Sequence, residues 1–205
     1  MKFKEYWGKQ FGNPRGLGGK IATAIMNRMN KQMYDAVARE IKTHERVLDI
    51  GFGNGLMFKK LSKSCNARLF GVDKSPDMVR LVSRKYKKLI KSGRLVLKQG
   101  NVLDIPYDKT FNQIFTINTV YFWPDLEDAL FQINTKLNKG GEFINACYTK
   151  EYLDEIKFTS VGYNKYTMQE LLQATLDAGF RAELVVTEPG KSFFIKAVKT
   201  VDKSL

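Results

Sequence analysis

Histidine and cysteine are scarce in this sequence, which contains one histidine, His44, and two cysteines, Cys65 and Cys147. The cysteines stand far apart and fit neither a metal-ligand nor a redox spacing, so we expect two reduced thiols and no metal site. No apolar run reaches the ~18 residues of a membrane span, and the N-terminus lacks the apolar core of a secretory signal. These absences predict a cytoplasmic protein without a membrane span.

Acidic residues are also few, since 34 Lys and Arg stand against 21 Asp and Glu, for a net charge of +13. Residues 1–31 and 74–98 carry this excess, and the remainder is close to neutral. Such stretches can attract nucleic acid, anionic lipid or an acidic substrate, and a solvated helix face gives the same pattern. The length of 205 residues, 43% of them hydrophobic, suits one α/β domain with a short extension.

Short apolar runs alternate with amphipathic stretches from residue 46 onward, which is the pattern of a parallel α/β sheet. We expect strands at 46–50, 67–72, 95–97, 111–117 and 142–147, with helices near 56–64, 76–89 and 125–136. Thr167 and Glu170 form a capping-box pair before a helix that ends near Ala178. Two more strands, near 181–187 and 192–198, are joined by a turn that suits an antiparallel hairpin.

The N-terminal residues 1–45 precede this pattern. Apolar residues recur there every four positions, which predicts a helix with a buried stripe; they are Ile21, Ile25, Met29, Met33, Val37 and Ile41. We expect residues 1–45 to form a segment and helix that cover the ligand site, and residues 46–205 to form one compact domain.

The turn after the first strand reads GFGNG over residues 51–55. Glycines allow a sharp turn and a close approach of a ligand, and ligands of such sheets bind beyond the carboxyl ends of the strands. A dinucleotide site would place its third glycine where this chain has Leu56, so a pyrophosphate cradle is disfavoured. Asp73 ends the second strand and can accept hydrogen bonds from both hydroxyls of a ribose.

Three segments, VLDIGFGNG at 47–55, GVDKSPDMV at 71–79 and LNKGG at 137–141, resemble the motifs of class I S-adenosylmethionine-dependent methyltransferases. The resemblance covers residues 46–147, and the nearest subgroup is the small-molecule type similar to ubiquinone/menaquinone-biosynthesis methyltransferases. It implies a Rossmann-like, doubly wound, seven-stranded sheet, mostly parallel with the C-terminal antiparallel hairpin and an N-terminal helical extension. It also implies S-adenosylmethionine as cofactor and S-adenosylhomocysteine as product.

The resemblance further implies roles for individual residues. Asp49 and the glycines would face the methionine part of the cofactor, Asp73 the ribose, and Asn101 with Val102 the adenine. The family usually has Asp where Asn101 stands, but the amide oxygen can still accept from the adenine amine. The full set of expected cofactor-binding residues is Asp49, Gly51, Phe52, Gly53, Gly55, Asp73, Lys74, Met78, Asn101, Val102 and Asn118.

Aromatic residues from the N-terminal segment and from the segments after the fourth and fifth strands should contact the methyl acceptor. They are Tyr6, Trp7, Tyr121, Trp123 and Tyr148. This lining suits a flat or cationic small molecule, whereas the lysines of the N-terminal segment favour an anionic one.

We assign no catalytic base from the sequence. His44 precedes the first strand and so lies at the wrong end of the sheet, and Phe122 and Trp123 stand where the family often has histidine. Tyr121 and Asp104 are the remaining weak candidates.

The sequence therefore predicts a methyltransferase acting on a small-molecule acceptor by in-line transfer, as a monomer or homodimer. A nucleic-acid (RNA) methyltransferase is an alternative because of the basic charge, although residues 118–121 read NTVY instead of the Asn-Pro-Pro-aromatic motif of base amino-group methylation. A non-catalytic S-adenosylmethionine-binding protein and a polyamine synthase on the same fold are further alternatives.

Overall fold

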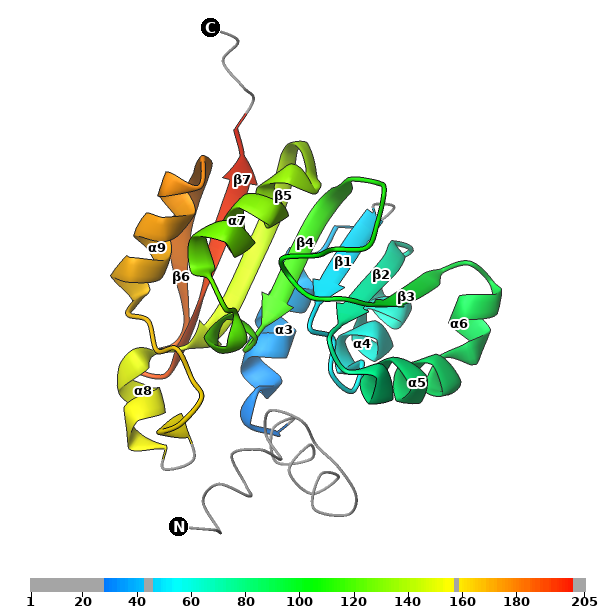
Figure 1. The fold of residues 1–205 in the computed structure, drawn as a ribbon. Helices are drawn as coiled ribbons and strands as arrows, with labels where there is room; N and C mark the ends of the chain where they lie inside the picture. The colour runs from blue at the N-terminus through cyan, green and yellow to red at the C-terminus, as the bar shows by residue number, and fades with distance from the viewer. Residues whose placement is uncertain (1–27, 43–45, 157–158, 201–205) are drawn as a thin grey trace, which may run out of the picture.

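The computed structural model describes residues 28–42, 46–156 and 159–200 and contains a seven-stranded sheet with helices on both faces (Figure 1). The strand order is β3-β2-β1-β4-β5-β7-β6. Strands β1 to β5 pair in parallel, and β7 lies antiparallel between β5 and β6. The strands are β1 (Arg46–Ile50), β2 (Arg68–Asp73), β3 (Leu95–Gln99), β4 (Phe111–Ile117), β5 (Leu137–Tyr148), β6 (Phe180–Glu188) and β7 (Ser192–Lys199). This arrangement confirms the expected doubly wound sheet with its C-terminal hairpin.

Helices cover the two faces of the sheet, with α3 packed beside α4 on one face and α7 beside α9 on the other (Figure 1). The helical elements are α3 (Lys31–Glu40), α4 (Leu56–Ser64), α5 (Pro76–Lys85), α6 (Lys87–Lys91), η1 (Val120–Phe122), α7 (Leu126–Thr135), α8 (Lys150–Glu155) and α9 (Met168–Asp177). Because both faces are covered, β1 and β2 are buried along almost their whole length. None of the helices in the described ranges is long and apolar enough to cross a membrane.

Local capping explains where several helices begin. The predicted capping box is present at α9, where Thr167 and Glu170 each hydrogen-bond the backbone N–H of the other. Asp125 caps α7 by accepting the N–H of Asp128. These side chains satisfy N–H groups that a helix start leaves without partners.

Two elements differ from the sequence prediction. The helix expected over 76–89 divides at Tyr86, where φ is −111° and ψ is 28°, and the Tyr86 hydroxyl donates to the Gly55 carbonyl at 2.8 Å. The fifth strand begins at Leu137 and not after the glycine pair, because Leu137 already pairs with Phe111. The pair Gly140 and Gly141 therefore lies at a register shift within the strand.

The N-terminal apolar stripe is partly inside the described ranges. Met33, Val37 and Ile41 are buried, as predicted for a packed helix face. The helix α3 begins only after Asn30, and Ile21 and Ile25 lie outside the described residues.

Asn145 on β5 is a buried polar side chain, 1% exposed, whose amide oxygen and nitrogen have no hydrogen-bond partner among the described residues. Leucine has the same number of side-chain heavy atoms, branched at the same carbon, and no polar atoms. We expect Asn145→Leu to raise the free energy of unfolding by ~1–2 kcal/mol, and hence the melting temperature by ~2–4 °C per kcal/mol. The measurement is thermal unfolding followed by circular dichroism.

Thr116→Val is the matched control for this substitution, because Thr116 is the register partner of Asn145 on β4 and its hydroxyl hydrogen-bonds the Ile50 carbonyl at 2.9 Å. This variant should melt at a lower temperature than the unmodified protein. A lower melting temperature for Asn145→Leu would contradict the interpretation of Asn145 as an unsatisfied group.

Candidate functional site

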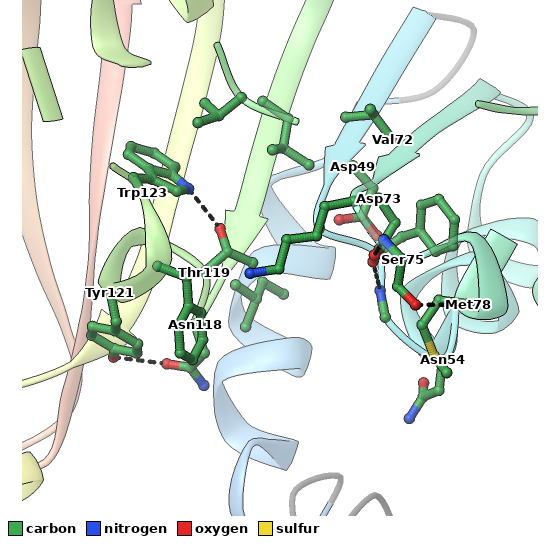
Figure 2. Close-up of a pocket in the computed structure, with 18 of the residues that line it drawn as sticks. Asp49, Asn54, Val72, Asp73, Ser75, Met78, Asn118, Thr119, Tyr121 and Trp123 are labelled. Atoms are coloured by element: carbon green, nitrogen blue, oxygen red, sulfur yellow. Dashed lines mark hydrogen bonds between the residues drawn. The ribbon is translucent and has the colours of Figure 1, made fainter. Parts of the chain in front are cut away.

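A cavity of about 530 Å³ lies at the carboxyl ends of β1, β2 and β4. Its size falls in the range of ~300–1,000 Å³ that is usual for small-molecule sites. Figure 2 shows two walls facing each other: Asp73, Ser75 and Met78 on one side, and Asn118 and Tyr121 on the other. The first wall follows β2 and the second follows β4.

The glycine loop after β1 forms the base of the cavity. Gly51 has a φ of +73°, and a Cβ at this position would lie 2.5 Å from Cγ2 of Thr119, so the loop packs directly on the segment after β4. Gly53 has a φ of +51°, and no atom of the described residues lies within 4 Å of the position that a Cβ would take there. No side chain therefore covers the Gly53 backbone on this side, and a ligand can approach the backbone closely.

Asp73 is the last residue of β2 and lines the cavity beside this loop. One oxygen of its carboxylate accepts the Gly53 N–H at 2.8 Å, and the other accepts the Ser75 N–H at 2.9 Å. Burial raises the pKa of Asp73, and the hydrogen bonds from Ser75 and Gly53 oppose that rise. The two bonds fix the carboxylate in the cavity and tie the glycine loop to the end of β2.

Asp49 lies on β1 and also lines the cavity, although the residue is only 4% exposed. Its carboxyl group has no hydrogen-bond or ion-pair partner among the described residues. Burial, together with the negative charge of Asp73, raises the pKa of Asp49 well above its ordinary value. A cationic group placed here would stabilise the carboxylate.

A hydrogen-bonded cluster of uncharged side chains forms the opposite wall. The Tyr148 N–H donates to the Tyr121 hydroxyl oxygen at 2.5 Å, and the Tyr121 hydroxyl donates to Oδ1 of Asn118 at 2.9 Å. Nδ2 of Asn118 donates to Oδ1 of Asn30 at 3.0 Å, and the Tyr148 hydroxyl donates to the same oxygen at 2.5 Å. Burial raises the pKa of Tyr121 well above its ordinary value, so this hydroxyl keeps its proton.

An aromatic cluster extends this wall. The Tyr163 ring lies 4.7 Å from that of Phe122 and 5.6 Å from that of Tyr121, measured between centroids. Asn164 holds the segment in place, since its N–H donates to the Tyr121 carbonyl and its Nδ2 to the Trp123 carbonyl. Apolar and aromatic surface therefore forms much of this half of the cavity.

Ten of the eleven expected cofactor-binding residues line the cavity, and so do Tyr121, Trp123 and Tyr148. Gly55 does not line it; a Cβ there would meet Val82 and Tyr86, so this glycine serves close packing behind the loop. Asp104 is exposed and does not line the cavity. Tyr6, Trp7 and His44 lie outside the described residues.

Asn101 lines the cavity, but its amide oxygen accepts the N–H groups of Leu103 and Asp104 at 2.8 and 3.1 Å. That oxygen is therefore already engaged and is poorly placed to accept from an adenine amine. The Nδ2 group of Asn101 is the side-chain atom left for a ligand.

The sequence analysis missed several lining residues: Met29, Asn30, Tyr34, Leu153, Ile156, Thr159 and Tyr163. Met29 was interpreted only as packing of a helix stripe, and Asn30 and Tyr34 flank that stripe without a motif. The one available signal was that Asn30 and Tyr34 are polar residues beside the apolar stripe of a helix that was expected to cover the site.

A family model described as a methyltransferase domain matches residues 47–141. YrhH of Bacillus subtilis (strain 168), by name a methyltransferase, is 35% identical over 113 residues, which are 54% of this chain and 61% of YrhH. The uncharacterized methyltransferase YdaC of the same strain is 30% identical over 128 residues, 62% of this chain and 67% of YdaC. The erythromycin 3''-O-methyltransferase of Saccharopolyspora erythraea is 31% identical over 126 residues, 60% of this chain and 41% of that enzyme. The chain thus spans less than two thirds of YrhH and of the erythromycin enzyme.

Solved structures share the fold over nearly the whole chain. A chain from the complex of the Haloferax volcanii Trm112 methyltransferase activator has a TM-score of 0.77 at 19% identity and covers 96% of this chain and 99% of its own. Geranyl diphosphate C-methyltransferase of Streptomyces coelicolor, crystallised with S-adenosylhomocysteine, has a TM-score of 0.73 at 14% identity and covers 97% of both chains. From the family match and the relatives together, this chain belongs to the class I S-adenosylmethionine-dependent methyltransferases.

Proposed function

We propose that this protein is an S-adenosylmethionine-dependent methyltransferase that acts on a small-molecule acceptor. The observation that carries the proposal is the pair of buried carboxyl groups, Asp73 and Asp49, in one cavity beside the bare backbone of Gly53. Asp73 offers a fixed hydrogen-bond acceptor for ribose hydroxyls, and Asp49 offers an unpartnered carboxyl for a cation.

The other residues that line the cavity near Asp73 and Gly53 also fit S-adenosylmethionine. Phe52, Met78 and Val102 supply apolar surface for an adenine ring, and Nδ2 of Asn101 can donate to one of its ring nitrogens. The cofactor, when bound, supplies an electrophilic methyl group.

The protein's own contribution would be to bind the cofactor and the acceptor, to align them, and to remove water from the reacting atoms. Alignment of two bound reactants can supply ~7–11 kcal/mol of a barrier without a dedicated acid or base. The Tyr121 hydroxyl donates to Asn118 at 2.9 Å, with the Tyr148 carbonyl as a longer second acceptor at 3.4 Å, and burial raises its pKa. We therefore do not assign Tyr121 as a base. The aromatic wall would hold the acceptor and exclude water from the reacting atoms.

Two features favour a small molecule as the acceptor. Aromatic rings line the part of the cavity that follows β4 and β5; they belong to Tyr121, Phe122, Trp123, Tyr148 and Tyr163. The erythromycin relative and the geranyl diphosphate neighbour are named for small-molecule acceptors. A nucleic-acid acceptor is the second candidate, because residues 74–98 are strongly basic.

The test is a turnover screen of the full chain with radiolabelled methyl donor across thiols, amines, phenols, quinol precursors and RNA. We expect label transfer to at least one small-molecule class and none to RNA. Labelled RNA, with a gel shift that weakens as salt is raised, would instead favour the second candidate. Binding of the donor without transfer to any class would contradict the proposed enzyme.

A further inference from the structure

Helices α5 and α6 carry a basic face at the end of the sheet that β3 forms (Figure 1). The Tyr86 N–H donates to the Val82 carbonyl at 2.9 Å, and the Ile90 N–H donates to the Tyr86 carbonyl at 3.1 Å, so helical hydrogen bonding continues on both sides of the break at Tyr86. The chain has no acidic residue between Asp77 and Asp104. All the basic residues of the two helices are exposed: Arg80, Arg84, Lys85, Lys87, Lys88 and Lys91.

Most of this charge is not neutralised within the fold. Arg80 pairs with Asp77, and Nζ of Lys85 donates to the Asn54 carbonyl at 3.1 Å. The other basic side chains of α5 and α6 have neither an ion pair nor a hydrogen bond within the described residues; they are Arg84, Lys87, Lys88 and Lys91. Arg84 and Lys88 stand four residues apart, as do Lys87 and Lys91, and like charges at this spacing destabilise a helix. Local helix stability therefore does not account for this arrangement of charge.

An apolar side chain lies within the basic face. Leu81 is 49% exposed, and Arg84 and Lys88 follow it at three and seven residues, a spacing that places them on its side of the helix. Val82, the next residue after Leu81, points inward and is fully buried. An exposed leucine among lysine and arginine side chains is typical of a helix that lies at the interface of an anionic membrane.

The position of the basic face favours a membrane over a nucleic-acid acceptor. Pro76, Asp77 and Met78 at the start of α5 line the cavity, but no residue of the range 80–91 does. Lys74 is the only Lys or Arg among the described residues that line the cavity. A nucleic-acid acceptor would place its phosphates around the reacting base, where the cavity offers this one cation. The basic face therefore lies beside the site and not around it.

We propose that α5 and α6 bind the surface of an anionic membrane. Leu81 enters the headgroup region, and the unpaired cations of the face contact anionic lipid headgroups; they are Arg84, Lys87, Lys88 and Lys91. The charge of the face is complementary to such a surface, and each basic residue near an anionic leaflet contributes about fivefold in affinity. This inference goes beyond the proposed function and does not depend on it.

Co-sedimentation of the 205-residue chain with lipid vesicles tests the proposal. Vesicles of phosphatidylcholine mixed with phosphatidylglycerol should bind the chain at least tenfold more tightly than vesicles of phosphatidylcholine alone, and added salt should weaken this binding. Arg84→Glu combined with Lys88→Glu should reduce the affinity for the mixed vesicles at least tenfold. Leu81→Gln leaves the charge unchanged and should reduce it about threefold or more, because it removes apolar surface.

Lys139→Glu combined with Arg181→Glu is the matched control. It changes the net charge by the same amount at two exposed residues of β5 and β6, whereas α5 packs against β2 and β3. This variant should bind the mixed vesicles within about threefold of the unmodified chain. Circular dichroism checks that every variant is folded.

Four results would overturn the inference. The unmodified chain binds neither kind of vesicle or binds both equally, the control loses as much affinity as the variant of α5 and α6, or Leu81→Gln binds as the unmodified chain does. The fourth is a gel shift with single-stranded RNA, without vesicle binding, that the variant of α5 and α6 loses and Leu81→Gln keeps. That pattern would identify a nucleic acid as the partner of this face.

Discussion

Asp73→Ala should weaken the binding of S-adenosylhomocysteine by at least tenfold. The substitution removes the acceptor that we propose for the ribose hydroxyls. It also leaves without a partner the N–H groups of Gly53 and Ser75, which donate to the carboxylate at 2.8 and 2.9 Å. Hydrogen bonds to a charged group contribute ~1.5–3 kcal/mol each, and ~1.4 kcal/mol corresponds to a factor of ten in affinity. Asp73→Asn keeps one accepting oxygen, so its loss should be smaller. Calorimetry of each variant measures both effects.

Asp77→Ala provides the control for charge, because Asp77 also lines the cavity but forms an ion pair with Arg80 on the same helix. Its affinity for S-adenosylhomocysteine should stay within about twofold of the unmodified chain, since an exposed ion pair contributes little. Unchanged affinity in Asp73→Ala, or an equal loss in Asp77→Ala, would show that the ribose lies elsewhere.

Asp49→Asn should raise the stability of the fold and weaken the binding of S-adenosylmethionine. The pKa of Asp49 is raised in the folded protein, so the fold favours the protonated carboxyl. The stability that this group contributes is full below its unfolded pKa of about 4 and is lost as the pH rises toward the raised folded value. Asparagine cannot ionise. At neutral pH we therefore expect the free energy of unfolding of the variant to exceed that of the unmodified chain by ~1–3 kcal/mol.

The gain should shrink as the pH falls toward 4, because both chains then carry a neutral group at this position. Binding of S-adenosylmethionine should weaken at least tenfold at neutral pH, since the variant lacks the charge that would meet a cation. The unmodified chain should release protons on binding, which calorimetry in buffers of different ionisation enthalpy detects. A variant that is less stable at neutral pH would refute the assignment of Asp49 as an unpartnered buried carboxyl.

The part of the site that could be predicted from the sequence is the glycine loop after β1 together with the end of β2. Gly51 and Gly53 adopt positive φ in the sharp turn after β1, which favours glycine. The acid that we propose for the ribose stands at the end of β2, so both features are visible in the sequence alone. The strands could also be predicted from the sequence, because parallel strands that are buried on both faces appear as apolar runs.

The other half depends on contacts between distant segments. Asn30 and Asn118 are 88 residues apart, and only the folded chain shows that they share a hydrogen bond. Tyr163 likewise follows no motif and reaches the cavity because Asn164 fastens its segment to η1. Gly55 matches the motif and yet packs under Tyr86, so a motif position alone did not establish a ligand contact.

Calorimetric titration of the 205-residue chain with S-adenosylhomocysteine, S-adenosylmethionine and NAD tests the cofactor site most directly. We expect saturable one-to-one binding of both sulfur nucleosides, mutual competition between them, and no binding of NAD. A chain that unfolds cooperatively on heating, and is therefore folded, but binds neither sulfur nucleoside would contradict the assignment of this cavity to the methyl donor.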